Sequence, residues 1–442
     1  MTGASAEHDS GSKLPTRFLA ILATAALAAS ACLVTPVGNG TSKGIIKIGS
    51  DFPTCTAGGQ ATENGVRFAL QQIQSAGGIR GFTLQYEGFD DCRQGEFSPD
   101  AGTANVRRML ADAAFLGMVG PYNSDVALAE IPVAAPQRFT MVSPSNTNPC
   151  LTKNLVICPV PHPQKLRGGN PNNYFRVATT DDNQGPSMAD YAFLKMNLRK
   201  VGVLDDSTAR GVSHANAFEA EFTKLGGTTM RASYRKDNTR DWTPILLAFR
   251  ESGAAGVYAG GDADQNICMS RRQMTDIGWV APFLSWEGIN FTRCIDDAAT
   301  NSVGMYFTSA VPNAARIPGA ASAIAAFQKA FPGPSDFGFF TMDAYDATNM
   351  LVRAIERAIG DAGGKMPSRE QVRAEMAKTK DFVGVMGTYS FDQNGDTTLE
   401  IMSVYMSKQV NDPSLSIGVC GSNAKNICYT WFDQFDLAKT KA

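Results

Sequence analysis

The sequence predicts an α/β protein built from two successive doubly wound parallel sheets. Short apolar runs alternate with amphipathic helical patterns twice, first over residues 44–142 and again over residues 200–286. This alternation is typical of parallel sheets with helices on both faces. A polar, Pro-rich stretch from Asn154 to Asn173 separates the two series. It predicts a surface insertion between two lobes, and it disfavours a single sheet of twice the size.

The elements of the first series follow from periodicity. The pattern over 62–75 places Val66, Phe68, Leu70 and Ile73 on one side of a helix, and Gly77-Gly78 supplies the left-handed residue that ends it. Read in the same way, the series contains strand 45–48, helix 62–75, strand 83–87, helix 101–111, strand 115–119, helix 126–137 and strand 140–142.

The second series repeats this order. It contains strand 200–204, helix 212–225, strand 228–234, helix 243–252, strand 256–259, helix 268–277 and strand 282–286. The patterns over 321–331 and 344–359 predict two more helices that belong to one lobe or the other. Residues 388–391 and 401–406 predict a hairpin around Asn394-Gly395, because Asn-Gly is a strong turn signal.

The N-terminus is typical of a secretory signal peptide. Lys13 and Arg17 precede an apolar run over 18–29 that is followed by small residues and Cys32. The run is about 12 residues long, and a bilayer-spanning helix needs about 20. We expect residues 1–31 to be a lipoprotein signal peptide and residues 32–43 to be a flexible tether.

The end of this leader, Ala29-Ser-Ala-Cys32, resembles a bacterial lipobox, whose cysteine is lipid-modified after cleavage. The family pattern usually has Leu where Ala29 stands, so simple cleavage near Ala31 without a lipid remains the alternative. We expect the protein to be exported to the cell surface or the periplasm and to be anchored through a lipid on Cys32.

The cysteines support export. Apart from Cys32, the chain holds an even number of cysteines, which in an exported protein indicates disulfides. A zinc site is disfavoured because there is no Cys-x-x-Cys and the three histidines stand far from likely partners. Nearness in sequence and flanking turn residues favour the pairs Cys55–Cys92, Cys150–Cys158, Cys268–Cys294 and Cys420–Cys428.

Several function classes are disfavoured by what the sequence lacks. The formal net charge is −2 and no Lys/Arg block occurs, which argues against a nucleic-acid partner. No Gly-rich phosphate-binding motif follows a strand, so we expect no nucleotide cofactor. Ser143 and Ser145 lack a Gly-x-Ser-x-Gly elbow and a histidine base, which leaves a hydrolase as a distant alternative. The stretch Asp392 to Glu400 lacks the spacing of a calcium loop, so we expect no metal.

The loops after the predicted strands contain the candidate ligand-binding residues. Ligands of open parallel sheets bind beyond the carboxyl ends of the strands. In the first series these loops offer neutral donors such as Ser124 and Thr147, which suit a carboxylate. In the second series they offer acids such as Asp262 and Glu287, which suit an ammonium. A ligand held between both sets would be zwitterionic, which points to an amino acid or a close relative.

A series of short motifs lies in one order along residues 44–400. The motifs are Lys47-Ile-Gly-x-Asp51-Phe, Asn64-Gly65, Ala76-Gly-Gly-Ile-x-Gly81, Asp90-Asp91, Val119-Gly120, Ser143-Pro-Ser-x-Thr147-x-Pro149-x-Leu-Thr152 and Trp286-Glu-Gly288. In this order they resemble the branched-chain amino-acid-type substrate-binding proteins of ABC importers, whose prototypes are the leucine/isoleucine/valine-binding proteins.

This resemblance implies the class I periplasmic-binding fold, in which two doubly wound parallel-sheet lobes are joined by three crossovers around a cleft that closes on the ligand. The crossovers are expected near 176–180, 307–312 and 382–386. It also implies a non-enzymatic, monomeric receptor for a small molecule that works with an ABC permease; a sensor of the same fold is the alternative. The expected division is lobe 1 from 44–175 and 312–382, and lobe 2 from 176–311 and 383–435.

The resemblance also implies roles for single residues. Ser124, Ser145 and Thr147 would take the α-carboxylate of the ligand, and Glu287 would take its α-ammonium. Ser124 could instead cap the helix near Val126, and Thr147 could instead shape the turn at Pro149. Tyr122 and Asn146, from the same loops, complete the first half of the site.

Departures from the family pattern predict a different specificity. Gly58-Gly59 stands where the family often has an aromatic residue, Arg210 precedes Gly211 in place of a Tyr, and Asp262 replaces the Tyr that commonly follows Gly-Gly. Arg210 and Asp262 are therefore expected to contact a larger or more polar ligand than an aliphatic amino acid. A solvent-facing Arg210 is the alternative.

Overall fold

The structure is a computed structural model that describes residues 42–155, 158, 163–411 and 419–437. The predicted signal peptide and Cys32, the predicted lipid acceptor, lie outside the described residues. Within those residues, no helix is both long enough and apolar enough to cross a bilayer.

The first sheet consists of parallel strands in the order β2-β1-β5-β6-β7. Its apolar side chains alternate between two cores: Ile46, Ile48 and Leu116 enter one, while Phe115 and Met118 enter the other. Both faces are therefore covered, as expected for a parallel sheet. The strands are β1 (Ile45–Phe52), β2 (Thr83–Asp90), β5 (Phe115–Val119), β6 (Thr140–Ser143) and β7 (Tyr174–Arg176).

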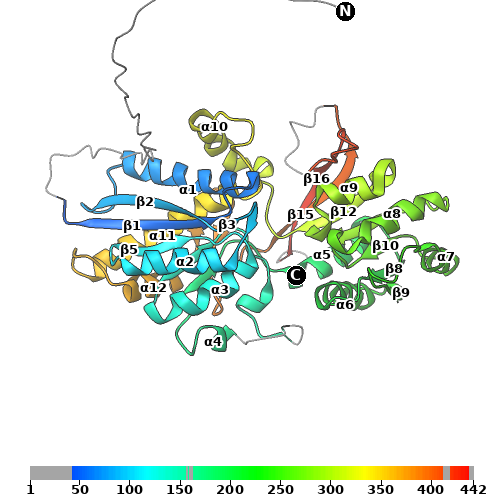
Figure 1. Cartoon of the computed structure of the whole chain (residues 1–442), viewed down its shortest axis with the longest axis horizontal. Coiled ribbons are helices and arrows are strands. Elements are labelled where there is room, and N and C mark those ends of the chain that lie inside the picture. The colour runs from blue at the N-terminus through cyan, green and yellow to red at the C-terminus, as the bar shows by residue number, and fades with distance from the viewer. Residues whose placement is uncertain (1–41, 156–157, 159–162, 412–418, 438–442) are drawn as a thin grey trace, which may run out of the picture. The chain divides into compact units, whose positions relative to one another are not determined.

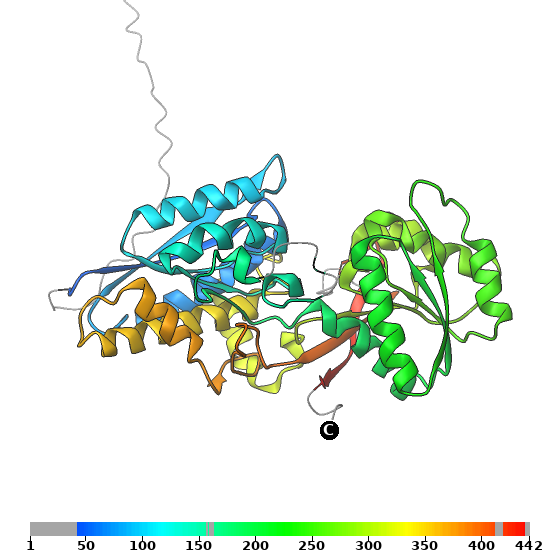
Figure 2. The same ribbon diagram turned by 90° about the horizontal axis from the view of Figure 1, so that it is seen from below.

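Helices cover the first sheet on both sides. Figures 1 and 2 show α2 and α3 on one face, and α1, α11 and α12 on the other. We call this sheet with its helices the first lobe. The helices are α1 (Ala57–Ser75), α2 (Pro99–Ala111), α3 (Ser124–Ala134), α11 (Thr341–Asp361) and α12 (Arg369–Ala377).

The second sheet has the order β16-β15-β12-β11-β10-β8-β9 and is parallel from β9 to β12. Its last two strands, β15 and β16, run antiparallel at one edge. The strands are β8 (Lys200–Asp205), β9 (Thr228–Ser233), β10 (Val257–Ala259), β11 (Phe283–Trp286), β12 (Met305–Ser309), β15 (Ile401–Gln409) and β16 (Ile427–Asp436).

The helices of the second sheet also form two sets. Val203 and Tyr258 point into the core with α5 and α6, whereas Leu204 and Val257 point into the core with α7, α8 and α9. Figure 2 shows helices on either side of these strands. We call this sheet with its helices the second lobe. The helices are α5 (Gln184–Asp190), α6 (Ala209–Lys224), α7 (Thr243–Glu251), α8 (Ile267–Asp276) and α9 (Thr292–Ala298).

Shorter elements complete the described chain. Helix α10 packs against the first core through Phe327, and α4 contacts α3. Two small antiparallel pairs, β3 with β4 and β13 with β14, lie outside the main sheets. These elements are β3 (Cys92–Arg93), β4 (Glu96–Phe97), α4 (Pro163–Leu166), α10 (Ala321–Ala330), β13 (Phe382–Val383) and β14 (Thr388–Tyr389).

The predicted hairpin around Asn394-Gly395 does not form. Strand β14 pairs with β13, and β15 pairs with β12 and β16. The Asn-Gly turn is present, with Gly395 at φ +87°, but it closes only a single bridge between Phe391 and Thr397. Strand β15 instead completes the second sheet, where Met402 and Val404 become fully buried.

The third crossover between the lobes, which was expected near 382–386, lies later in the chain. Met386 and Tyr389 are buried in the first core, and Leu399 packs against it. The Asp346 carboxylate of α11 accepts hydrogen bonds from the Val385 and Met386 backbone N–H groups, each at 2.8 Å. These bonds hold the segment on the first lobe, so the chain enters the second sheet only near the start of β15.

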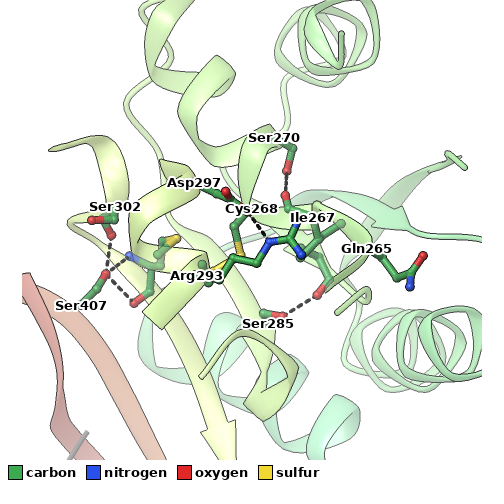
Figure 3. Close-up of a disulfide and its surroundings, with 12 residues drawn as sticks. Gln265, Ile267, Cys268, Ser270, Ser285, Arg293, Asp297, Ser302 and Ser407 are labelled. Atoms are coloured by element: carbon green, nitrogen blue, oxygen red, sulfur yellow. Dashed lines mark hydrogen bonds and ion pairs between the residues drawn. A yellow bond between two sulfur atoms is a disulfide. The ribbon is translucent and has the colours of Figure 1, made fainter. Parts of the chain in front are cut away.

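All four expected disulfides are present: Cys55–Cys92, Cys150–Cys158, Cys268–Cys294 and Cys420–Cys428. Figure 3 shows the surroundings of the third, in which Cys268 of α8 meets Cys294 of α9. The neighbouring Arg293 pairs with Asp297 at 3.3 Å on the exposed side of α9. This cross-link fixes two short helices on the second lobe.

Candidate functional site

The loop that follows β6, residues 143–152, is folded on its own hydroxyl groups. The Ser143 hydroxyl donates to the Pro121 carbonyl at 2.8 Å and accepts the N–H groups of Ser145 and Asn146. The Ser145 hydroxyl donates to the Tyr122 carbonyl at 2.8 Å. Both serine hydroxyls therefore fasten this loop to the one after β5, which leaves neither as a nucleophile. We call residues 143–152 the β6 loop.

Asn146 supports the β6 loop from inside. Its side-chain amide donates to the Tyr122 carbonyl at 2.7 Å and accepts from the Tyr174 hydroxyl at 2.7 Å. Its exposed fraction is 1%. Because both ends of the amide are occupied, the side chain of this predicted site residue shapes the loop.

Ser124 and the β6 loop meet at the start of α3. Ser124 is the first residue of the helix, and the preceding Asn123 is its N-cap but makes no side-chain cap bond. The Ser124 hydroxyl accepts the Asn148 N–H at 3.5 Å. Backbone N–H groups at a helix N-terminus favour an anion. The predicted carboxylate-binding groups therefore lie where the helix dipole would assist them.

Thr147 brings the two predicted halves of the site together. Its hydroxyl donates to the Glu287 carboxylate at 3.4 Å. Its carbonyl accepts the Asp181 N–H at 2.8 Å. The sequence placed Thr147 and Glu287 on opposite sides of a ligand, and the structure places them in contact with each other.

Glu287 lies in a strongly acidic environment. Burial and the nearby Asp181 raise the pKa of Glu287 to about 8. Burial also raises the pKa of Asp181, against the opposing influence of hydrogen bonds and of Arg210. Gln184 bridges the two acids, because its amide donates to Asp181 at 2.9 Å and accepts the Glu287 N–H at 3.3 Å. The site therefore contains carboxylates whose charge a ligand cation would stabilise.

Asp181 and Gln184 were not predicted from the sequence. They follow the first passage between the lobes, in a stretch without a strand or loop pattern that would have placed them. The available signal was only the run of polar residues 181–184 just after Thr180. Their position depends on the path of the chain between two sheets, which periodicity does not report.

Arg210 and Asp262 form a second, looser group. Their closest atoms, Nη1 and Oδ2, are 3.7 Å apart, and the exposed side-chain fractions are 56% and 18%. Burial raises the pKa of Asp262 to about 7, although Arg210 opposes the shift. The Arg210 guanidinium lies 5.9 Å from the Trp286 ring, on which His214 stacks at 3.9 Å. Arg210 therefore contacts the site's aromatic residue as well as Asp262.

An aromatic surface is present next to Gly58, where the family pattern suggested it had been lost. A Cβ at Gly58 would lie 2.9 Å from the Tyr122 hydroxyl, so the glycine leaves room for this ring. The Tyr122 ring packs edge-on against Phe340, with centroids 5.5 Å apart. Tyr122 and Phe340 thus supply the apolar surface, and Phe340 is a residue that the sequence did not indicate.

The described residues contain no group of three or more His, Cys, Asp or Glu side chains arranged to hold a metal ion.

A family model described as periplasmic binding protein matches residues 53–411 of this chain. The Leu/Ile/Val-binding protein homolog 3 of Brucella melitensis biotype 1 is 28% identical over 348 residues, which cover 78% of this chain and 86% of that protein. Among solved structures, a leucine binding protein from Thermotoga maritima matches with a TM-score of 0.63 and 22% identity over 89% of this chain and 99% of its own.

A solute binding protein from Rhodopseudomonas palustris HaA2, solved in complex with p-hydroxybenzoic acid, also matches with a TM-score of 0.63. It is 15% identical, and the match covers 89% of this chain and 97% of that chain. These structural likenesses show the fold, and they come from proteins whose ligands differ.

Proposed function

This chain belongs to the periplasmic binding protein family, whose members are solute receptors and not enzymes, and we propose that it is the receptor of an ABC importer. It would capture an amino acid or a related small zwitterionic ligand outside the cytoplasm and deliver it to a membrane permease. The main observation in support of this proposal is the hydrogen bond of 3.4 Å between the Thr147 hydroxyl and the Glu287 carboxylate. Donors suited to a carboxylate and an acid suited to an ammonium thereby lie within the span of one α-amino acid.

In this proposal the ligand lies between Thr147 and Glu287, and each of its two charged groups binds one of these residues. The carboxylate would bind Ser124, the Thr147 hydroxyl and the Thr147 backbone N–H, next to the start of α3. The ammonium would bind Glu287, with Asp181 close behind it. A ligand that contacts both lobes favours the closed arrangement, because closure needs a ligand with higher affinity for that state.

The acids favour an amine over an aromatic acid as the ligand. Burial raises the pKa values of Glu287, Asp181 and Asp262, because their charged forms lose the solvation that water would give them. A cationic group would relieve this, whereas a hydroxybenzoate brings only a further negative charge. Arg210 and Asp262 would meet the side chain of the ligand, which favours a polar amino acid over a purely aliphatic one.

The decisive experiment is identification of the ligand. Mass spectrometry of gently unfolded protein should detect a co-purified amine, and calorimetry should then give its affinity. A panel of leucine, lysine, glutamate and 4-hydroxybenzoate covers aliphatic, basic, acidic and amine-free ligands. We expect an amino acid to bind and 4-hydroxybenzoate not to bind. Binding of 4-hydroxybenzoate alone would contradict the proposal.

We also propose that Cys32 anchors the mature receptor in the membrane. The supporting observation is the Ala29-Ser-Ala-Cys32 sequence at the end of a secretory leader. Intact-mass analysis of the mature protein should show an N-terminal Cys32 that carries a diacylglycerol. A mature chain without this added mass would contradict the lipid anchor and would favour simple cleavage near Ala31.

A further inference from the structure

Arg176, the last residue of β7, is a fully buried arginine directly beneath the β6 loop. Its exposed fraction is 0%. Its Nη1 donates to the Asn148 carbonyl at 2.7 Å and, more weakly, to the Asn146 carbonyl at 3.4 Å. Its Nη2 donates to the Thr152 hydroxyl. One guanidinium thus holds both halves of the loop.

The same guanidinium is tied to the segment that leads into β15. Its Nε donates to the Asp396 carboxylate at 2.7 Å, and the other oxygen of Asp396 accepts the Thr152 hydroxyl at 2.9 Å. The Arg176 backbone N–H donates to the Gly395 carbonyl at 3.1 Å. The β6 loop, the end of β7 and the last passage between the lobes therefore share one buried ion pair.

The hydrogen bond from Arg176 to the Asn146 carbonyl determines where the backbone N–H of Thr147 points. In a trans peptide the C=O and the following N–H point in opposite directions. Because the Asn146 carbonyl faces Arg176, the Thr147 N–H faces away from it. Among the described residues, this N–H has no hydrogen-bond partner, whereas the N–H groups of Ser145, Asn146 and Asn148 are all bonded. An N–H left free in this way is available to a ligand oxygen.

We propose that Arg176 is a positioning residue for ligand binding: together with Asp396 it presents the Thr147 N–H to the ligand carboxylate and couples the β6 loop to the segment entering β15. A planar, five-donor guanidinium can hold two carbonyls, a hydroxyl and a carboxylate at fixed angles, which a lysine ammonium cannot. This inference rests on the proposed function for its ligand, but the loop geometry it describes exists without one.

The first test needs no ligand. Hydrogen exchange followed by mass spectrometry should show faster exchange of the β6 loop and of the segment around Asp396 in Arg176→Lys and Asp396→Asn than in the wild type, with little change elsewhere. Arg357→Met is the matched control, because Arg357 pairs with Glu375 at 3.0 Å away from the site. Unchanged exchange of the loop in folded Arg176→Lys would overturn the proposal.

The second test measures affinity for the amino acid found with the wild type. We expect Arg176→Lys to weaken binding at least 10-fold and Asp396→Asn to weaken it by less, because the asparagine keeps the shape and loses the charge. Arg357→Met should leave affinity unchanged while it lowers thermal stability. Wild-type affinity in folded Arg176→Lys would overturn the proposal. If the wild type binds no amino acid, only the proposed function fails, and the exchange test still decides the role of Arg176 in the loop.

Discussion

Glu287 is a carboxylate whose charged form is disfavoured by burial and by Asp181. If it binds the ligand ammonium, Glu287→Ala should lower affinity by about 2–5 kcal/mol, as for a desolvated charge pair that loses one partner. Isothermal titration calorimetry with the identified ligand measures this loss. Glu221→Ala is the control, since Glu221 pairs with Lys224 on the exposed part of α6. Equal affinities of wild type and Glu287→Ala would remove Glu287 from the site.

The pH dependence of binding follows from the same residue. Below a pKa of about 8 the unliganded Glu287 is largely protonated, whereas the ammonium binds the charged carboxylate. Binding must therefore release a proton, and affinity should rise between pH 6 and pH 8, by at most about 10-fold per pH unit. Titrations in buffers of different ionisation enthalpy measure the number of protons released. An affinity that is constant over this range would contradict the role of Glu287.

Single residues also show what sequence reasoning could reach. Thr147 and Glu287 were predicted because each follows a strand in a loop with a recognisable motif. Asp181, Gln184 and Phe340 were missed because their places depend on how the chain passes between the sheets. The free N–H of Thr147 could not be predicted either, since it requires the position of Arg176 under the loop.

At the level of packed elements, three buried acids lie between β1, α2 and α3. Asp51, Asp91 and Glu130 are fully buried, and burial together with repulsion from nearby carboxylates raises their pKa values, for Asp91 to about 8. A carboxyl group whose folded pKa is raised contributes stability below its unfolded pKa and loses it as the pH rises through the folded value. These acids therefore make the first lobe less stable in alkaline solution.

The substitution Asp91→Asn should remove part of this loss of stability in alkaline solution. The amide has nearly the same shape and cannot ionise, so the variant should gain on the order of 2 kcal/mol of unfolding free energy at pH 8.5 and little at pH 5. Urea unfolding at both pH values measures the difference. A variant whose stability relative to the wild type is the same at both pH values would contradict the raised pKa of Asp91.

Helix α12 depends on a capping box. The Ser368 hydroxyl accepts the Gln371 N–H at 3.2 Å, and the Gln371 side chain accepts the Ser368 N–H at 2.9 Å. Ser368→Ala should cost about 1 kcal/mol of unfolding free energy, with ligand affinity unchanged because α12 lies away from the site. Urea unfolding and calorimetry on the same variant separate the two effects. A loss of affinity would indicate that α12 is coupled to the site.

Most elements could be predicted because their signals are local. The strands of both parallel series and most of the longer helices show clear periodicity, and the disulfides link cysteines that are close in sequence. Helix α12 was missed although its Ser-x-x-Gln cap is visible in the sequence. The predicted hairpin at Asn394-Gly395 was wrong because it paired β15 with the strand nearest to it in sequence. In the structure β15 pairs with β12, which buries Met402 and Val404.

Across the whole molecule, ligand binding and stability should be linked. A ligand that binds only the folded chain adds about 2.7 kcal/mol at 100 times its dissociation constant. A thermal-shift assay should therefore rank the amino acids in the same order as calorimetry. Glu287→Ala at the same ligand concentration should lose most of the ligand-induced shift, measured from the ligand-free melting temperature of the variant itself. A shift that survives in this variant would show that Glu287 does not bind the ligand.

The two strands at the antiparallel edge of the second sheet, β15 and β16, have a consequence for biosynthesis. The chain begins this sheet at β8, leaves it for α10, α11 and α12, and returns only at residue 401. Phe307 of β12 stacks on Tyr405 of β15 and meets Tyr429 of β16 edge-on. Until a ribosome has translated these last strands, an inner strand of the sheet has no neighbour on one side. A premature stop codon after α12 would therefore leave the second lobe without β15 and β16. It would also leave the first lobe without Met386 and Tyr389, which are buried in its core.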